Sequence, residues 1–262
     1  MPSLNYIYQY LNYLWASVTK YKIHSPFLFK LVTEVFEKHL LYEDYERLEF
    51  LREKLLRDET EITIQDFGAG SRMYPTNKRS VKQIAKSSIK KEKYAHLLYM
   101  FVRHFKANSI LELGTSLGIT TAYLASAHEN VRVHTIEGCP NIAKIAEENF
   151  KRLKLKNIDL IVGRFDDVLD DVCKSAGQFD LIFVDGNHRE LATINYFEKL
   201  LPYCHNNTVL VFDDIHWSEE MEEAWQFIKN HESVTVTIDI LEMGIAFLRR
   251  ENRQKEHFSI YY

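Results

Sequence analysis

Short apolar runs alternate with longer segments of helical periodicity over most of the chain, and this pattern predicts strands that alternate with helices. The expected strands cover residues 110–113, 131–136, 158–162, 179–184, 208–212, 234–240 and 245–249. The expected helices cover residues 94–106, 118–128, 141–154, 190–200 and 219–230. Strands and helices in this order predict a mainly parallel sheet with helices on both faces.

The last two expected strands are joined only by residues 241–244. A link of this length cannot contain a crossover, so these strands must form an antiparallel hairpin. We therefore predict an α/β fold with a doubly wound, seven-stranded, mainly parallel sheet that ends in a C-terminal antiparallel hairpin. Residues 94–262 are expected to form this domain.

Residues 1–93 have a different pattern, in which aromatic side chains recur at helical spacing. Helices are expected over much of residues 5–60, and Ser25 followed by Pro26 indicates a helix start. We predict a helical N-terminal cap over residues 1–93. An amphipathic helix that pairs two subunits as a homodimer would give the same pattern.

The composition and net charge give no support for a nucleic-acid or membrane partner. The chain has 262 residues, of which 46% are hydrophobic and 27% are charged, as is typical of globular proteins. A net charge of -4 gives no reason to expect a nucleic-acid or anionic-membrane partner. A basic stretch within residues 78–93 could bind phosphate or RNA, but the acidic whole favours a solvated helix face.

The cysteines and the N-terminal residues indicate in which cellular compartment the protein is expected. Cys139, Cys173 and Cys204 are far apart and odd in number, so they predict neither a disulfide framework nor a zinc site. The first residues lack the pattern of a signal peptide, and the longest apolar runs have the length of strands. These features predict a cytoplasmic protein without a membrane span.

Two glycine turns follow apolar runs, at residues 66–70 and 111–118. Pro75 prevents a helix from following the first turn directly, whereas residues 119–125 favour a helix after the second. The next expected strand ends in Glu137, 23 residues after Gly114, where an acidic residue would bind a ribose diol. The ligand turn is therefore expected at Gly114, and residues 66–70 become a loop of the cap.

The spacing of the glycines limits the ligand. Gly114 and Gly118 lack the third glycine that a pyrophosphate requires, and no P-loop lysine is present. This absence disfavours an NAD-dependent oxidoreductase. An adenosyl ligand without phosphates suits the turn better, because Gly114 leaves room for an extended tail.

Acidic residues follow the fourth and fifth expected strands. Asp185 comes after the fourth strand, and Asp213 and Asp214 come after the fifth. Neighbouring parallel strands would bring these carboxylates to one edge of the sheet, where they repel one another unless a cation or protons intervene. Mg²⁺ prefers such oxygen ligands. Alternatively, Asp214 could cap the helix that begins near Ser218.

Two histidines follow the same strand ends. His188 lies three residues after Asp185, and His216 lies two residues after Asp214. Imidazole changes its charge near neutral pH, so both histidines are candidate general bases. A lone loop histidine is otherwise an ordinary surface residue.

The segment Leu111-Glu112-Leu113-Gly114, together with Glu137, resembles motifs I and II of the class I S-adenosylmethionine (SAM)-dependent methyltransferases. The resemblance covers residues from about 94 to 250 and is closest to the metal-dependent small-molecule O-methyltransferases of the catechol and sugar types. It implies a Rossmann-like fold. The lysine that catechol-type enzymes use after the fourth strand is not evident. Asp213-Asp214-Ile215-His216 is instead similar to the sugar type.

The resemblance implies SAM as cofactor, with Glu112 near the methionine ammonium, Glu137 on the ribose, and Gly163, Arg164 and Phe165 beside the adenine. The implied cofactor-binding residues are Glu112, Gly114, Thr115, Ser116, Gly118, Glu137, Gly163, Arg164, Phe165 and Asp185. The implied metal ligands are Asp185, Asp213 and Asp214, and the implied bases are His216 and, second, His188. The cap would cover the acceptor through His24, Phe27, Arg72 and Tyr74.

The resemblance thus predicts an enzyme that methylates a hydroxyl of a small molecule with the help of Mg²⁺, which chelates the acceptor and lowers its hydroxyl pKa. One alternative is a metal-free methyltransferase that acts on nitrogen, protein or RNA, supported only by the basic stretch. A second alternative is a non-catalytic module that binds SAM.

Overall fold

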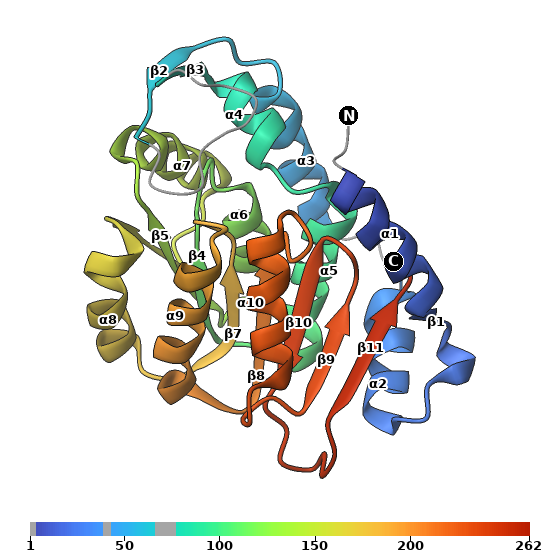
Figure 1. Cartoon of the computed structure of the whole chain (residues 1–262). Coiled ribbons are helices and arrows are strands. Elements are labelled where there is room, and N and C mark those ends of the chain that lie inside the picture. Colours follow the sequence, from blue (N-terminus) through green and yellow to red (C-terminus); the bar gives the residue numbers. More distant parts are fainter. Residues whose placement is uncertain (1–3, 39–42, 66–76) are drawn as a thin grey trace. The chain divides into compact units, whose positions relative to one another are not determined.

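The computed structural model describes residues 4–38, 43–65 and 77–262 and confirms the predicted α/β class, with more parallel than antiparallel strand pairs (Figure 1). The chain divides into two compact units. One unit is His39–Gly177, and the other combines Met1–Lys38 with Gln178–Tyr262.

The unit His39–Gly177 contains a three-stranded parallel sheet in the order β4-β5-β6 and a small antiparallel pair, β2 and β3. The strands are β2 Glu61–Thr63, β3 Lys78–Ser80, β4 Ser109–Leu113, β5 Arg132–Glu137 and β6 Ile158–Val162. The helices are α3 Glu43–Leu55, α4 Val81–Ser88, α5 Glu92–Phe105, α6 Ile119–Ser126, α7 Pro140–Leu153 and α8 Phe165–Ala176. Each strand of the parallel sheet is thus followed by a helix, and the sequence pattern predicts the helices after β4 and β5.

Local sequence explains where these helices begin and end. Ser80 and Gln83 form a capping box at the start of α4, which satisfies two backbone N–H groups there. Pro140 occupies the first turn of α7, where its missing N–H costs nothing. The helices α5 and α7 end in Lys106 and Lys154, both with a left-handed backbone.

The second unit contains six strands in the order β7-β8-β10-β9-β11-β1. The strands are β1 Ser17–Val18, β7 Phe179–Val184, β8 Cys204–Asp213, β9 Val236–Asp239, β10 Met243–Phe247 and β11 Glu256–Ile260. The helices are α1 Leu4–Ala16, α2 Pro26–Leu31, α9 Glu190–Leu200 and α10 Glu219–Asn230, with short turns of helix at η1 Lys20–Lys22, η2 Val32–Phe36 and η3 Leu201–Tyr203. The predicted hairpin is β9–β10, and β10 also pairs antiparallel with β8.

Three elements differ from the sequence-based expectation. The chain does not end at the hairpin, because β11 pairs parallel with β9 and β1 then pairs with β11. Most residues of β11 are only partly buried, so its apolar pattern is weak. The helix α8 also differs from the expectation, which has no helix between β6 and β7, and it buries only Leu169, Val172 and Cys173.

The helices α9 and α10 lie side by side against β8 (Figure 1). The Phe212 ring lies 6.1 Å from the Phe197 ring of α9 and 6.3 Å from the Trp225 ring of α10. At Gly244 on β10, an added Cβ would lie 2.7 Å from the Trp225 ring, so α10 packs closely there. In the described parts of the chain, no helix is long and apolar enough to cross a bilayer.

The N-terminal residues do not form one compact piece. Residues 1–38 group with 178–262, whereas residues 39–93 group with 94–177. The helix that the sequence predicts after Ser25 is α2, which begins at Pro26. The covering role of residues 1–93 stays a prediction.

Candidate functional site

The turn after β4 has the strand–turn–helix form that the sequence predicts for a ligand site. Gly114, Ser116 and Gly118 all have positive φ angles, of 108°, 46° and 81°. The N–H groups of Gly114 and Thr115 donate to the carbonyl of Ile136 at 3.0 and 3.2 Å, which ties the turn to β5. α6 then begins directly after Gly118.

Gly118 is required for packing as well as for its backbone angle. A Cβ added at this position would lie 2.5 Å from the Phe150 ring of α7. The side chain of Asn149, also on α7, donates to the carbonyl of Leu117 at 2.9 Å. The turn is therefore held against α7 from one side and against β5 from the other.

Glu137 ends β5, and its carboxylate connects two turns. One oxygen accepts the backbone N–H of Ser116 at 2.8 Å, and the other accepts the backbone N–H of Cys139 at 2.9 Å. The Ser116 hydroxyl lies 2.7 Å from the hydroxyl of Ser88, at the end of α4. The acidic residue predicted for the ribose is thus fixed beside the glycine turn, and Ser88 is a contact that sequence reasoning missed.

Glu112 lies beneath the turn and is fully buried. Its carboxylate accepts hydrogen bonds from the hydroxyls of Thr121 and Thr135, the latter at 2.6 Å. The Thr135 hydroxyl also lies 2.6 Å from that of Thr115. The carboxylate therefore ties β5 and α6 together. A contact of Glu112 with the methionine ammonium stays a prediction.

Gly163, Arg164 and Phe165 form the turn from β6 to α8. The N–H of Gly163 donates to the carbonyl of Glu137 at 3.0 Å. This turn therefore lies next to Glu137, the residue predicted to bind the ribose. Arg164 precedes the first residue of α8 and forms loose, exposed ion pairs with Asp166 and Asp167. Adenine binding by this turn stays a prediction.

A second set of candidate residues meets at the ends of β7 and β8. These strands pair in parallel, with Val184 opposite Phe212, so Asp185 and Asp213 follow neighbouring positions. Asp185, His188 and Asp213 each offer a ligand atom within 4.8 Å of the others. His188 returns towards Asp185 because Asn187 and His188 both have positive φ angles, of 70° and 46°.

This cluster of Asp185, His188 and Asp213, called the acidic cluster below, could hold a divalent cation. Asp213 is 1% exposed, and its carboxylate lies near a second carboxylate, which is costly without a positive charge. His188 Nε2 lies 3.7 Å from Asp185 Oδ1. The two carboxylates suit Mg²⁺ or Mn²⁺, whereas an imidazole ligand is more typical of Zn²⁺ or Fe²⁺.

Asp214, the third metal ligand expected from the sequence, does not belong to the acidic cluster. Its backbone has a positive φ of 54°, and its N–H donates to the carbonyl of Glu242 at 2.7 Å. It does not cap α10 either. Ser218 does so, by accepting the N–H of Met221 at 3.2 Å.

His216, the first candidate base, is buried between two carboxylates. Its Nδ1 donates to Glu222 on α10, and its Nε2 donates to Asp239 on β9 at 2.7 Å. Burial alone would lower the pKa of His216, but the hydrogen bonds to Asp239 and Glu222 raise it to about 9. A histidine that is protonated at neutral pH cannot accept a proton, so this environment opposes the predicted role as base.

The expected acceptor contacts in the cap are not supported where the structure describes them. Phe27 packs edge-on against Phe247, with ring centroids 5.1 Å apart. Phe247 pairs with Val209, whereas Asp213 of the acidic cluster pairs at the other end of β10. Phe27 thus lies at the end of β10 away from Asp213, and its contact with the acceptor stays a prediction. His24 is exposed, and Arg72, Tyr74 and the turn 66–70 lie outside the described residues.

The basic stretch forms β3, α4 and the start of α5. The apolar side of α4 is buried through Val81, Ile84 and Ala85, while Lys86 is exposed. Lys82 forms an ion pair with Glu59. This arrangement is that of a solvated helix face.

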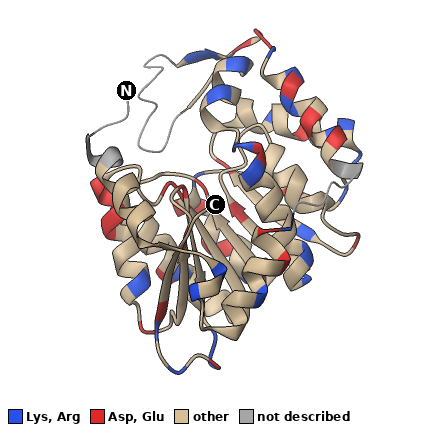
Figure 2. Ribbon diagram, turned by 90° about the vertical axis from the view of Figure 1, so that its right-hand side faces the viewer, with Lys and Arg blue, Asp and Glu red and all other residues tan. Residues whose placement is uncertain are grey.

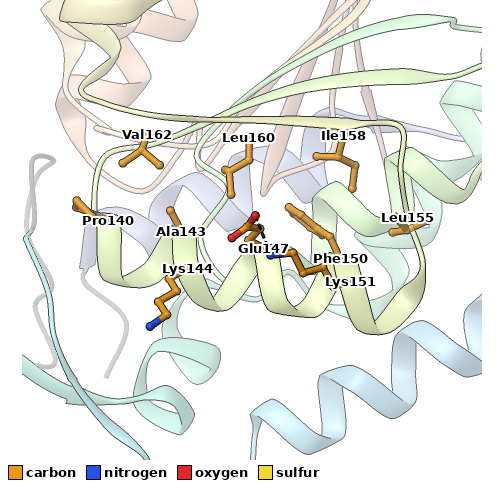
Figure 3. A pocket seen from close by; sticks show the side chains of 10 residues that line it. All are labelled: Pro140, Ala143, Lys144, Glu147, Phe150, Lys151, Leu155, Ile158, Leu160 and Val162. Atoms are coloured by element: carbon orange, nitrogen blue, oxygen red, sulfur yellow. Dashed lines mark ion pairs between the residues drawn. The ribbon is translucent and has the colours of Figure 1, made fainter.

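A hollow of about 540 Å³ lies between α7 and β6 (Figure 3). Apolar side chains of β6 form one wall, and α7 contributes an ion pair between Lys151 and Glu147 at 2.9 Å. None of the predicted site residues lines it.

Comparison with known proteins gives a match over the part of the chain that contains the Gly114 turn, Glu137 and the acidic cluster. Residues 111–215 match a family model described as a methyltransferase domain. A catechol O-methyltransferase of Niastella koreensis is 31% identical over 121 residues, which are 45% of this chain and 54% of that protein. The chain thus spans about half the length of the curated relative that it matches.

Solved structures share the fold. An O-methyltransferase from Bacillus cereus in complex with SAH has a TM-score of 0.57 at 18% identity, covering 84% of this chain and 96% of its own. An O-methyltransferase from Streptomyces achromogenes, involved in tomaymycin synthesis and in complex with SAM, has a TM-score of 0.58 at 17% identity, covering 83% and 96%. With the domain match, these similarities confirm the predicted resemblance to class I methyltransferases.

Proposed function

We propose that this protein is a SAM-dependent O-methyltransferase that methylates a hydroxyl of a small molecule with the help of a divalent cation, in the first place Mg²⁺. One observation carries the proposal. The residues that match a methyltransferase domain, 111–215, include both the Gly114 turn with Glu137 and the acidic cluster.

The Gly114 turn fits an adenosyl ligand by its chemistry. Gly114 has no side chain, which leaves space for a ligand tail at the start of the turn. The Glu137 carboxylate would accept hydrogen bonds from the ribose hydroxyls, and Thr115 and Ser116 would lie along the tail. The turn from Gly163 to Phe165 would flank the adenine.

The acidic cluster fits a cation because its carboxylates crowd one another. Asp185 and Asp213 would be the ligands. When bound, SAM supplies a methyl group on a sulfonium sulfur and the cation supplies a Lewis acid that lowers the pKa of the acceptor hydroxyl.

His188 is the proposed base. Its ring lies beside Asp185, within reach of a hydroxyl held at the acidic cluster, and 6.2 Å from the Trp217 ring. His188 would take the hydroxyl proton as the oxygen attacks the methyl carbon. The Trp217 ring offers an apolar surface to an acceptor.

Methyl transfer from labelled SAM to a panel of catechols and sugars tests this function. We expect transfer with Mg²⁺, loss of transfer with EDTA, and loss in His188→Gln with Mn²⁺ affinity retained. His205→Gln, at a histidine paired with Asp180, is the matched control and should keep activity. If His188→Gln also loses Mn²⁺ binding, His188 is a metal ligand and not the base.

The same assay separates the alternatives. Transfer that survives EDTA and prefers nitrogen, protein or RNA acceptors supports a metal-free methyltransferase. Binding of SAM without transfer to any acceptor supports a non-catalytic module. We also propose a cytoplasmic location, which is supported by the odd number and the wide spacing of the three cysteines.

A further inference from the structure

A second hollow, of about 710 Å³, lies where β5 and β6 begin, and it is called the basic hollow below. Positively charged side chains from four separate segments line it, namely Arg47 of α3, Arg103 of α5, Arg132 at the start of β5 and Lys156 just before β6. All four residues are exposed, and among the described residues that line the basic hollow only Glu129 is acidic. The chain as a whole has more acidic than basic residues, and Figure 2 shows the two kinds interspersed. The basic hollow therefore carries a local excess of positive charge.

The loop between α6 and β5 lines the basic hollow and is held in place by side chains from other elements. Arg103 Nη1 donates to the carbonyl of Ala127 at 2.8 Å. The amide of Asn157 donates to the carbonyls of Ala125 and Val131, at 2.8 and 3.0 Å. Because these hydrogen bonds fix the loop, a ligand would bind to it at little cost in conformational entropy.

Hydrogen bonds within the protein also orient two of the guanidinium groups. Arg132 donates to the Asp159 carboxylate through Nε, at 2.5 Å, and through Nη2, so its Nη1 can still donate to a ligand. Arg103 donates to a carbonyl, which has no net charge, so that bond does not neutralise the guanidinium. Oriented guanidinium groups bind phosphate oxygens through paired N–H donors.

The basic hollow lies at the opposite end of β5 from the predicted cofactor residues. Arg132 is the first residue of β5 and Glu137 is the last. A strand of this length spans about 17 Å. A ligand in the basic hollow would therefore not overlap a nucleoside bound at Glu137.

We propose that the basic hollow binds a small anion that carries more than one phosphate group. Its cations come from four segments, so several of them can form charged hydrogen bonds at once only if the ligand offers several oxyanions. The volume is that of a small-molecule site. A nucleic acid would extend beyond the basic hollow over a chain with a net charge of -4, which disfavours it.

Calorimetric titration of the full chain with inorganic tripolyphosphate, in buffer without divalent cations, tests the site. We expect one site per chain and binding about three- to tenfold weaker in Arg47→Gln and in Lys156→Gln, because each change removes one charged hydrogen bond. Both side chains are exposed, so both variants should remain folded. Lys86→Gln, at an exposed lysine of α4 in the basic stretch, is the matched control and should bind like the wild type.

Glu137→Ala should also bind tripolyphosphate like the wild type, because Glu137 lies at the other end of β5. Absence of binding, or a loss in Lys86→Gln without a loss in Arg47→Gln and Lys156→Gln, would overturn the proposal. A changed affinity in Glu137→Ala would place the anion at the cofactor turn instead. A single-stranded oligonucleotide that binds more tightly than tripolyphosphate, and less tightly in Arg47→Gln and Lys156→Gln, would make the basic hollow a nucleic-acid surface. None of these readouts depends on methyltransferase activity.

Discussion

The Nε2 atom of His216 lies 2.7 Å from Oδ2 of Asp239, while its Nδ1 donates to the Glu222 carboxylate. One imidazolium thereby links the segment after β8 to α10 and to β9. Burial raises the pKa of Glu222, but the hydrogen bond from His216 outweighs it and the net pKa is lowered. His216 is thus placed to stabilise the fold next to the acidic cluster.

The stability of the protein should depend on pH through His216. Its pKa is raised from 6.5 to about 9, so its contribution is complete below pH 6.5 and is lost as the pH rises through 9. The shift corresponds to on the order of 3 kcal/mol in the free energy of unfolding. Urea unfolding between pH 6 and pH 10 measures this loss.

The variant His216→Gln provides the control for this pH dependence. It should be destabilised by about 3 kcal/mol or more at pH 7, because Glu222 and Asp239 then face each other without a cation. Between pH 6.5 and 9 its stability should change much less than that of the wild type. Equal slopes in the two proteins would contradict the charged state assigned to His216.

Cation binding should depend on Asp185 and Asp213. We expect Asp213→Asn and Asp185→Asn each to weaken Mn²⁺ binding at least tenfold, because either change removes a carboxylate ligand. Water-proton relaxation by Mn²⁺ measures this affinity. Asp171→Asn, at an exposed residue of α8, controls for the change in net charge.

The same titration decides the role of Asp214, which the sequence predicts as a ligand and which lies outside the acidic cluster. Asp214→Asn should bind Mn²⁺ nearly as well as the wild type. A loss equal to that of Asp213→Asn would return Asp214 to the ligand set.

Gly118→Ala should destabilise the protein by about 2 to 4 kcal/mol, because the new methyl group meets the Phe150 ring at a positive φ. Thermal unfolding measures the change. Phe150→Leu alone and combined with Gly118→Ala completes a double-mutant cycle. Part of the cost should disappear in the double variant, whereas strictly additive effects would mean that Phe150 does not limit this position.

The regular part of the fold could be predicted because each element carries its own signal. Strands β6, β7 and β8 each contain an apolar run of at least three residues, and α7, α9 and α10 begin and end within two residues of the expected positions. Strand β11 gave no such signal, since Phe258 and its neighbours are only partly buried. Its pairing with β9 depends on contacts that are distant in sequence, which periodicity does not contain.

The part of the candidate site that lies directly at the ends of parallel strands could be predicted from the sequence. Asp185 and Asp213 lie close together because β7 and β8 are parallel neighbours. Glu137 lies beside the glycine turn because β4 and β5 are also parallel neighbours. The state of His216 could not be predicted, because Asp239 comes from a strand that starts 20 residues later. Only the tertiary structure shows that both ring nitrogens are occupied.

The most direct test of the proposed function is a calorimetric titration with SAM of the wild type, Glu137→Ala and Glu147→Ala. Glu147 is an exposed residue of α7 paired with Lys151, so its variant controls for the lost charge. We expect micromolar binding by the wild type and by Glu147→Ala, and affinity about 10- to 100-fold weaker in Glu137→Ala, which loses charged hydrogen bonds to the ribose. Absence of SAM binding by the wild type, or equal affinity in all three proteins, would contradict the assignment of the Gly114 turn and Glu137 as the cofactor site.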